Sequence, residues 1–352
     1  MPRPTEPVKR ICYADDITVY ASGVQIPELS KKIEDYLTVM SVFLKANSLL
    51  ISAPKSSVTL FTPDPKQAKD HPKIKIADSE LPLLRSPKIL GVHLDTSLSF
   101  HIHCEQAASR VKKRNNILKA LAGTTWGQQK ETLLITYKAV GRSIANYAAP
   151  VWSTIASITS IDKIQIAQNE ALRIATGAHL MSSIDHLHSE AKMLKVGDHS
   201  DLLSAQYLVQ CLDPEHVCHN ITTMDPPPRQ MKQTLYTKHH QSIRPLLADT
   251  NKESLQAVHT EAVNKARDSQ EANRVLRDRP PSISSEEVTL ERKQRTTLSQ
   301  LRSGHCKLLN SYKNRLLPTV SSSCPDCGAP SQDVPHLFNC TAHPNTLTSV
   351  NL

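Results

Sequence analysis

Two adjacent carboxylates, Asp15 and Asp16, stand between apolar and aromatic stretches near the beginning of the sequence. No basic residue lies within four positions after them, so their mutual repulsion calls for another source of positive charge. A divalent cation with oxygen ligands supplies that charge, and pairs of such ions roughly 3.5–4 Å apart catalyse phosphoryl transfer. A solvated Asp-Asp turn is the alternative interpretation. The pair is therefore a candidate magnesium site.

A second chemical group lies near the C-terminus, where the cysteines and one histidine have the spacing C-x2-C-x8-H-x3-C. Its members are Cys324, Cys327, His336 and Cys340. Two thiolates on one turn, followed by a histidine and a cysteine on a short helix, predict tetrahedral zinc ligation with no open position. Pro335 can begin that helix, and His343 is a rival to His336. The alternative is chance cysteines in a tail. A filled coordination sphere favours a structural or nucleic-acid-binding role over hydrolysis.

Basic residues gather in two places, and the whole chain carries a formal net charge of +9. The first cluster consists of Arg110, Lys112, Lys113 and Arg114, and the second, which leads into the cysteine group, includes Arg292 and Arg295. Lys and Arg side chains on one helix face bind phosphates without sequence preference. A solvated helix face is the alternative. The charge indicates a polyanionic partner, either nucleic acid or an anionic membrane, and of these we expect nucleic acid and no membrane.

The elements that must position these residues predict an α+β fold. A strand–turn–strand unit is expected over Ile11–Tyr20, followed by a helix with apolar positions from Ile26 to Leu44 spaced three or four apart. Short strands are expected at Leu49–Ile51, Val58–Phe61 and Lys88–Leu94. From Cys104 to about Leu212 the periodicity is helical.

Four helices are expected in that region. The first places Ala107, Val111, Leu118 and Leu121 on its apolar face, and the second aligns Leu133, Tyr137, Val140, Ile144 and Tyr147. The third runs from about Ile161 to Ala175 and ends at Gly177, and Ser200 could cap the fourth.

The proline-rich stretch around Pro226 divides the chain. We expect a mixed α/β part over 1–100, a helical part over 101–212, a partly disordered linker over 213–288 with a polar helix near Leu255–Leu276, and a basic helix with the zinc group over 289–352. The basic helical segment has Leu298, Leu301, Leu308 and Leu309 as expected anchors. No secretion signal and no run of eighteen apolar residues occurs, so we expect an intracellular protein of the nucleus or cytoplasm.

Three segments in series resemble the reverse transcriptases of non-LTR retrotransposons, in particular the jockey-like group. The stretch Ile11–Tyr20, with Tyr-Ala-Asp-Asp at its centre, resembles polymerase motif C, Ser52–Phe61 resembles motif D, and Pro87–Asp95 resembles motif E. The similarity continues through Tyr147–Trp152 and Leu301–Cys306. It implies a partial polymerase palm, a helical thumb and connector, and a zinc knuckle.

The resemblance also implies roles for single residues. Asp15 would bind magnesium and Asp16 would support it, Lys55 would lie near the phosphates of the incoming nucleotide, and Lys88 and Gly91 would shape the primer grip. The partners would be an RNA template, an RNA–DNA or DNA duplex, and deoxynucleotides.

The family places motif A, motif B, the fingers and an endonuclease before motif C, and only twelve residues precede Tyr13. We therefore expect the C-terminal part of a polymerase that is inactive alone. The alternatives are a non-catalytic RNA- or DNA-binding protein that uses the basic helices and the knuckle, and a decayed transposon remnant.

Overall fold

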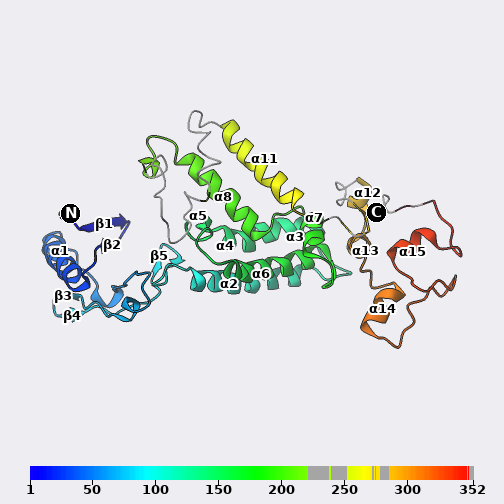
Figure 1. Cartoon of the computed structure of the whole chain (residues 1–352), viewed down its shortest axis with the longest axis horizontal. Helices are drawn as coiled ribbons and strands as arrows, with labels where there is room; N and C mark the ends of the chain where they lie inside the picture. The colour runs from blue at the N-terminus through cyan, green and yellow to red at the C-terminus, as the bar shows by residue number, and fades with distance from the viewer. Residues whose placement is uncertain are drawn as a thin grey trace. The chain divides into compact units, whose positions relative to one another are not determined.

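The structure, a computed structural model, describes residues 1–220, 238, 252–271, 273, 275–277, 285–346 and 348. The chain divides into two compact units, Met1–His103 and Cys104–Leu352. Unit 1 is α+β, and the regular elements in the described part of unit 2 are helices (Figure 1).

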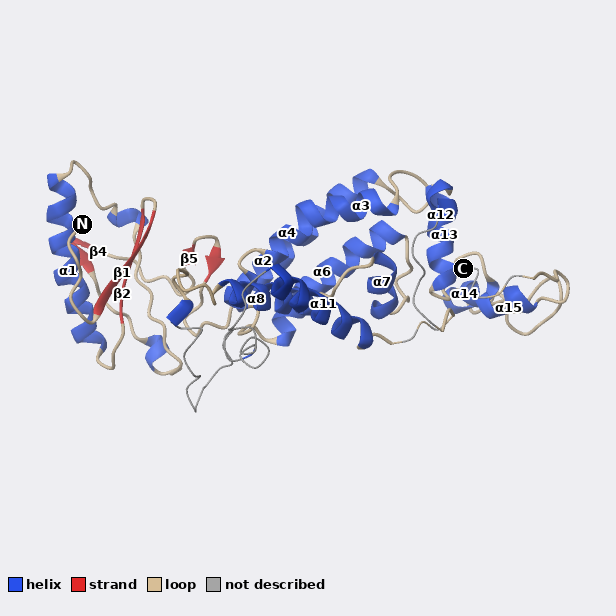
Figure 2. Ribbon diagram, turned by 90° about the horizontal axis from the view of Figure 1, so that it is seen from above, coloured by secondary structure: helices blue, strands red, loops and turns tan. Residues whose placement is uncertain are grey.

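Unit 1 is built on a β-hairpin that packs against one long helix (Figure 2). Strands β1 (Val8–Tyr13) and β2 (Asp16–Ala21) are antiparallel, with Val8 opposite Ala21 and Tyr13 opposite Asp16. Helix α1 (Ile26–Ala46) begins with a proline in its first turn and buries Tyr36, Leu37, Met40 and Leu44. Because side chains alternate along a strand, Val8, Ile17, Val19 and Ala21 meet this helix, whereas Ile11, Tyr13 and Tyr20 are exposed.

The rest of unit 1 is mostly irregular, with two short 3-10 turns, η1 (Ala53–Lys55) and η2 (Gln67–Lys69), and two small hairpins. These are β3 (Lys75–Ile76) with β4 (Ser79–Glu80), and β5 (Lys88–Ile89) with β6 (Val92–His93).

Two strand predictions in this unit are wrong, and a third is right only in part, because Lys88–Leu94 forms the β5–β6 hairpin rather than one strand. Leu49–Ile51 is not a strand, because the Leu49 N–H bonds back to the Leu44 carbonyl oxygen at the end of α1 (2.9 Å) and Pro54 cannot donate to a ladder. Val58–Phe61 forms only a single bridge, between Val58 and Leu83.

In unit 2, helix α6 (Ile158–Thr176) packs against several other helices and is bonded to α2 (His101–Leu121). The predicted apolar face of α2 is found, since Ala107, Val111 and Leu118 are buried. Asn115, fully buried, donates from Nδ2 to the Ala167 carbonyl oxygen of α6 at 2.9 Å. Helix α6 ends at Gly177 with φ of 73°, as the sequence predicts.

The predicted second helix is broken by a π-helical turn. It consists of α3 (Lys130–Tyr137), η3 (Lys138–Arg142) and α4 (Ser143–Asn146), followed by α5 (Ala149–Trp152). Leu133 and Tyr137 are buried as expected, whereas the helix ends at Asn146 and Tyr147, the residue after it with ψ of 122°, is 53% exposed. The placement of Tyr147 on the apolar face is therefore wrong.

Two further helices lie beside α6: α7 (Ile184–Ala191), which the sequence did not predict, and α8 (Val196–Gln210). The prediction that Ser200 caps the fourth helix is wrong, because Ser200 is buried inside α8. The cap comes from another helix instead: Oε1 of Gln165 in α6 accepts the Val196 N–H at 2.7 Å.

Helix α11 (Lys252–Asp268), in the segment expected to be a linker, lies along α8 (Figure 1). Pro226 and much of its surroundings lie outside the described residues. The chain then forms α12 (Ser285–Thr289), α13 (Arg292–Arg302), α14 (Asn310–Leu316) and α15 (Val334–Asn339).

Helix α13 crosses the end of α6 with a polar buried face. The buried residues are Arg292, Arg295, Thr296, Ser299, Gln300 and Arg302. The crossing is close, because a Cβ added at Gly177 would meet Thr296 Cγ2 at 2.5 Å. Of the leucines expected to anchor this segment, Leu309 is buried, but Leu308 is 67% exposed.

Candidate nucleic-acid interface and metal centres

The two carboxylates lie at the tip of the β1–β2 hairpin. Ala14, with φ of 52°, and Asp15 form the turn, and Asp16 is the first residue of β2. Both carboxylates are exposed at one end of the hairpin, where a cation can reach them. Within the described ranges, no group of three metal-ligating side chains includes Asp15 or Asp16. The turn therefore offers two carboxylates and no third ligand.

The other residues expected at a polymerase site are also in unit 1. Lys55 ends η1 and is exposed, and Lys88 is exposed in β5. Leu90 and Gly91, with φ of 45° and 86°, make the two-residue turn of the β5–β6 hairpin, a conformation that favours glycine. In the described part of the chain no ion pair joins Lys55 to Asp15 or Asp16.

The four residues expected to bind zinc come together. The ligand atoms of Cys324, Cys327, His336 and Cys340 all lie within 4.8 Å of one another, and Cys327 Sγ is 3.4 Å from His336 Nε2. Two thiolates on one tetrahedral zinc are about 3.7 Å apart, given Zn–S bonds of about 2.3 Å. The cluster is thus compatible with one zinc ion. His343 is outside it and pairs with Asp326 at 3.3 Å.

The backbone around these cysteines prepares them as ligands. The Gly328 N–H donates to the Cys324 carbonyl oxygen at 3.0 Å, and Gly328 has φ of 74°. The N–H groups of Cys327 and Asp326 lower the pKa of the Cys324 thiol, and that of Ala329 lowers the pKa of Cys327. Burial raises the pKa of Cys340. Three sulfurs and one imidazole are the donors that structural zinc prefers.

A short helix carries the remaining two ligands. Asp333 caps α15, because its Oδ1 accepts the His336 N–H at 3.0 Å. Val334, fully buried, packs with Cys306 and Leu309 in a small core. The knuckle is therefore anchored to the segment around α14 by apolar contacts as well as by its ligands.

The first basic cluster lies on α2 and is exposed to solvent, with Lys112 on the side towards Glu170 of α6, whose carboxyl pKa it helps to lower. Arg110, Lys112, Lys113 and Arg114 are all exposed, and no ion pair holds them within the described residues. Lys119, further along α2, pairs with Glu170 of α6 at 2.6 Å. The four unpaired cations are free to contact phosphates.

The second basic cluster has a different role from the one the sequence suggested. Arg292 is 4% exposed and donates from Nη1 and Nη2 to the carbonyl oxygens of Ala175 and Ile174, at 2.5 and 2.6 Å. Arg295 is 5% exposed and forms a two-pronged pair with Glu131, at 2.5 and 2.6 Å. The expectation that these two arginines bind nucleic acid is therefore corrected: they hold α13 against α6 and α3.

Arg295 belongs to a balanced ion cluster in unit 2. Its members are Lys130, Glu131, Glu190, Glu287, Arg295 and Arg302. Lys130 Nζ donates to Glu190 at 2.8 Å and to Glu287 at 3.2 Å. Burial alone would raise the pKa of Glu287, but Lys130 and Arg302 outweigh it and lower that pKa to about 2. The cluster is structural, and sequence reasoning missed it because its partners are far apart in the chain.

A second set of metal-ligating side chains was also missed. Cys211, His216 and Cys218 place their ligand atoms within 4.8 Å of one another. Their spacing, C-x4-H-x-C, is the signal that could have found them.

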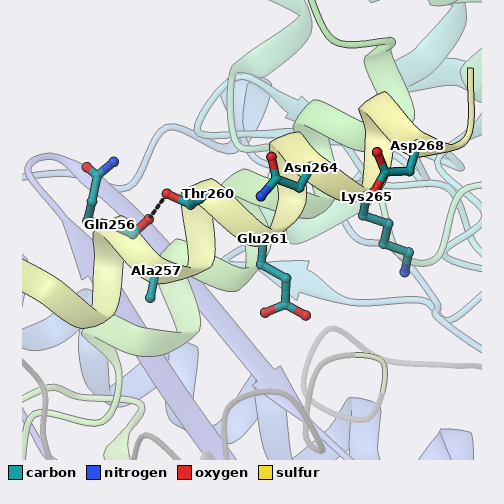
Figure 3. Close-up of a pocket in the computed structure, with 7 residues that line it drawn as sticks. All are labelled: Gln256, Ala257, Thr260, Glu261, Asn264, Lys265 and Asp268. Carbon is teal, nitrogen blue, oxygen red and sulfur yellow. Dashed lines mark hydrogen bonds between the residues drawn. The ribbon is translucent and has the colours of Figure 1, made fainter.

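One hollow and the question of a membrane segment complete the description of the surface. An open hollow on α11 is lined by residues of that one helix (Figure 3), so no second element brings chemistry to it. No helix within the described ranges is long and apolar enough to cross a bilayer.

Comparison with known proteins finds polymerases of mobile elements. The chain is 27% identical over 186 residues to the RNA-directed DNA polymerase from mobile element jockey of Drosophila funebris, a match that covers 53% of this chain and 20% of that protein. It is 24% identical over 195 residues to the probable RNA-directed DNA polymerase from transposon X-element of Drosophila melanogaster, covering 55% and 21%. It is also 25% identical over 201 residues to the probable RNA-directed DNA polymerase from transposon BS of Drosophila melanogaster. That match covers 55% of this chain and 21% of that protein.

The chain therefore spans about a fifth of the length of these curated relatives. No family model and no solved structure matches it. Over roughly half of the chain, these similarities confirm what the three motifs indicate, a kinship with the RNA-directed DNA polymerases of jockey-type non-LTR retrotransposons.

Proposed function

We propose that this chain supplies the motif C portion of the palm, the thumb and the zinc knuckle of a retrotransposon reverse transcriptase. The observation that carries the proposal is the Tyr-Ala-Asp-Asp turn at the tip of an antiparallel hairpin, in a chain similar to RNA-directed DNA polymerases. In this proposal unit 1 is part of the palm, and α2 with the helices beside it is the thumb. The corresponding partners are an RNA template, a primer duplex and deoxynucleotides.

The chemistry would be attack of a primer 3′-hydroxyl on the α-phosphate of a nucleotide, assisted by magnesium. Asp15 would bind the ion and Asp16 would support it. Lys55 would lie near the nucleotide phosphates, with Lys88 and Gly91 in the primer grip. A two-metal site needs more carboxylate oxygens than one turn provides, so the remaining ligand would come from beyond the described residues.

Duplex binding would rest on the patch of Arg110, Lys112, Lys113 and Arg114. Four exposed cations within two turns of one helix concentrate positive charge, and a duplex carries one negative charge per about 1.7 Å of its axis when both strands are counted. The knuckle, with zinc bound by three cysteines and His336, would form a second contact with RNA or DNA. Neither contact requires base recognition, as expected of a polymerase that copies any sequence.

The test is the salt dependence of binding to an RNA–DNA duplex by the full chain. Replacing Lys112, Lys113 and Arg114 by Ala should lower the affinity and reduce the slope of log K against log salt by up to about one unit per lost contact. The control replaces Lys31, Lys45 and Lys73, exposed but scattered over unit 1, and removes the same charge. If the two triple variants gave equal slopes of log K against log salt, the α2 patch would be a solvated helix face. The proposal that these helices form the thumb would then be wrong.

A further inference from the structure

Three metal-ligating side chains converge where α8 ends, in a part of the chain that the proposed polymerase function does not use. Cys211 is the residue directly after α8, and His216 and Cys218 lie in the turns beyond it. Their ligand atoms lie within 4.8 Å of one another, as in the knuckle. In the part of the chain that the structure describes, these two groups alone meet that criterion.

A series of turns folds the chain back over the end of the helix. The Cys211 N–H donates to the Tyr207 carbonyl oxygen at 3.0 Å and so closes the last turn of α8. Oδ1 of Asp213 accepts the Glu215 N–H at 2.9 Å, and the Asp213 carbonyl oxygen accepts the His216 N–H at 3.0 Å. The backbone thus brings the imidazole and the second thiol to Cys211 without help from another element.

Tyr207, one turn before Cys211, completes the surroundings of the group. Its hydroxyl oxygen is 3.7 Å from Cys218 Sγ, and its ring meets that of His216 edge-on with centroids 5.8 Å apart. A phenol that donates to a thiolate is a typical outer partner of a metal site, where it orients the ligand and stabilises its charge. The Tyr207 hydroxyl is therefore placed to support a metal-bound Cys218.

A buried cysteine in an apolar core is common, and that explanation would suffice for Cys211 alone. It does not account for a half-buried second thiol, an imidazole and a phenol at the same point. We propose that Cys211, His216 and Cys218 bind a second zinc ion. Glu215, directly before His216, and His219, directly after Cys218, are the fourth donors that adjoin the group in the sequence.

The geometry requires only a small adjustment. Sulfur and nitrogen ligands on one zinc are about 3.6–3.7 Å apart, against an upper limit of 4.8 Å for the atoms here. Without metal, the Cys218 N–H donates to His216 Nδ1 at 3.1 Å. On zinc binding through Nδ1 this hydrogen bond would be replaced by a bond to the ion. The bound metal would fasten the chain after α8 to the end of that helix, which packs against α5, α6 and α11.

The experiment counts zinc in the full chain, purified under reducing conditions. Wild type should hold two ions, and the double variant Cys324→Ser/Cys327→Ser, which removes the knuckle, should hold one. Adding Cys218→Ser to that double variant should remove the last ion. Cys12→Ser, which changes an exposed cysteine outside both groups, should keep two.

Cys218 is chosen because it is half-buried, whereas replacing the fully buried Cys211 could unfold the chain. Helical content by circular dichroism must stay unchanged in the triple variant. In the knuckle-free double variant, cobalt should give the absorption of a tetrahedral thiolate site, and Tyr207→Phe should weaken cobalt binding about 10-fold without changing the stoichiometry. One zinc in wild type and none in the double variant would overturn the proposal, as would an ion that survives Cys218→Ser.

Discussion

Arg292 shows how far one side chain's role can differ from what its charge suggests. Its guanidinium donates hydrogen bonds to the carbonyl oxygens of Ile174 and Ala175 at the end of α6. Its Nε also donates to the Gly123 carbonyl oxygen, at 3.2 Å. Replacing Arg292 by Met should lower the free energy of unfolding by about 2–4 kcal/mol, because buried carbonyls lose a charged donor. Urea unfolding measures this change.

Lys293 provides the matched control, since it is exposed next to Arg292. Lys293→Met should change stability by less than about 0.5 kcal/mol. If Arg292→Met instead weakened duplex binding while stability stayed at the wild-type value, the original nucleic-acid interpretation of this residue would be right after all.

Glu287 gives a prediction about pH. Its pKa falls from 4.5 to about 2 in the folded chain, because Lys130 and Arg302 outweigh the effect of burial. The stabilisation is therefore complete above about pH 4.5 and is lost as the pH falls from there towards 2. Glu287→Gln should destabilise the chain at pH 7, by about 3 kcal/mol if the buried cations lose their partner, and should flatten the acid limb of the stability curve.

Glu286→Gln is the control for this change, because Glu286 is exposed beside Glu287. Chemical unfolding at several pH values between 2 and 7 compares the two variants. The same acid limb in both would mean that other carboxyl groups, such as that of Glu131, cause the loss of stability.

The residues that could be predicted are those whose partners lie close by in the sequence. The knuckle ligands span seventeen positions, and their spacing predicted that they come together. Asp15 and Asp16 lie at the tip of a hairpin as expected, whereas their binding of magnesium stays a prediction. The ion pair of Arg295 could not be predicted in this way. Its partner Glu131 is 164 residues away, and the residues around each of them do not indicate that they pair.

At the scale of elements, periodicity predicted helices where one face is continuously apolar. Helices α1, α2 and α6 appear as expected, because three- or four-residue spacing places the apolar residues of each helix on one face of that helix. Periodicity did not predict the features of a helix that depend on other helices. The first N–H of α8 is capped by Gln165 of α6, and α13 buries arginines rather than leucines. Local patterns cannot report such contacts.

The knuckle is the element that depends most on its ligands. Zinc removal by a chelator should unfold the segment around α15, since ligation is a major source of folding energy in so small a unit. Cys327→Ser and His336→Ala should each abolish zinc binding at this site, whereas His343→Ala should spare it.

Zinc content of the full chain, with the second group disabled by Cys218→Ser, distinguishes the two histidines. His343→Ala is the matched control because it removes an exposed imidazole of the same segment. Loss of zinc in His343→Ala together with retention in His336→Ala would show that the arrangement of ligands differs from the one described.

At the scale of the whole molecule, binding and catalysis should separate. The 352-residue chain should bind a primer annealed to an RNA template but should not extend it with magnesium, because the described carboxylate turn lacks a third acidic ligand. Fusing the corresponding upstream polymerase region of a jockey-type relative should restore extension, and Asp15→Ala should abolish it again.

Asp70→Ala, which removes an exposed carboxylate elsewhere in unit 1, should leave the restored extension unchanged. Magnesium-dependent extension by the 352-residue chain alone, lost in Asp15→Ala and kept in Asp70→Ala, would contradict this prediction. It would mean that a residue within the chain provides the missing ligand.

The crossing of α13 over α6 also has a consequence for synthesis on the ribosome. Arg292 follows Ala175 by 117 residues, which takes roughly 6–23 s to translate at about 5–20 residues per second. Until then the carbonyl groups of Ile174 and Ala175 lack their arginine donor, and Glu190 has Lys130 but not Arg302. A nascent chain that stops before Arg292 would therefore leave the helical unit without its closing helix, and proteases that sample open states would have the most time to act there.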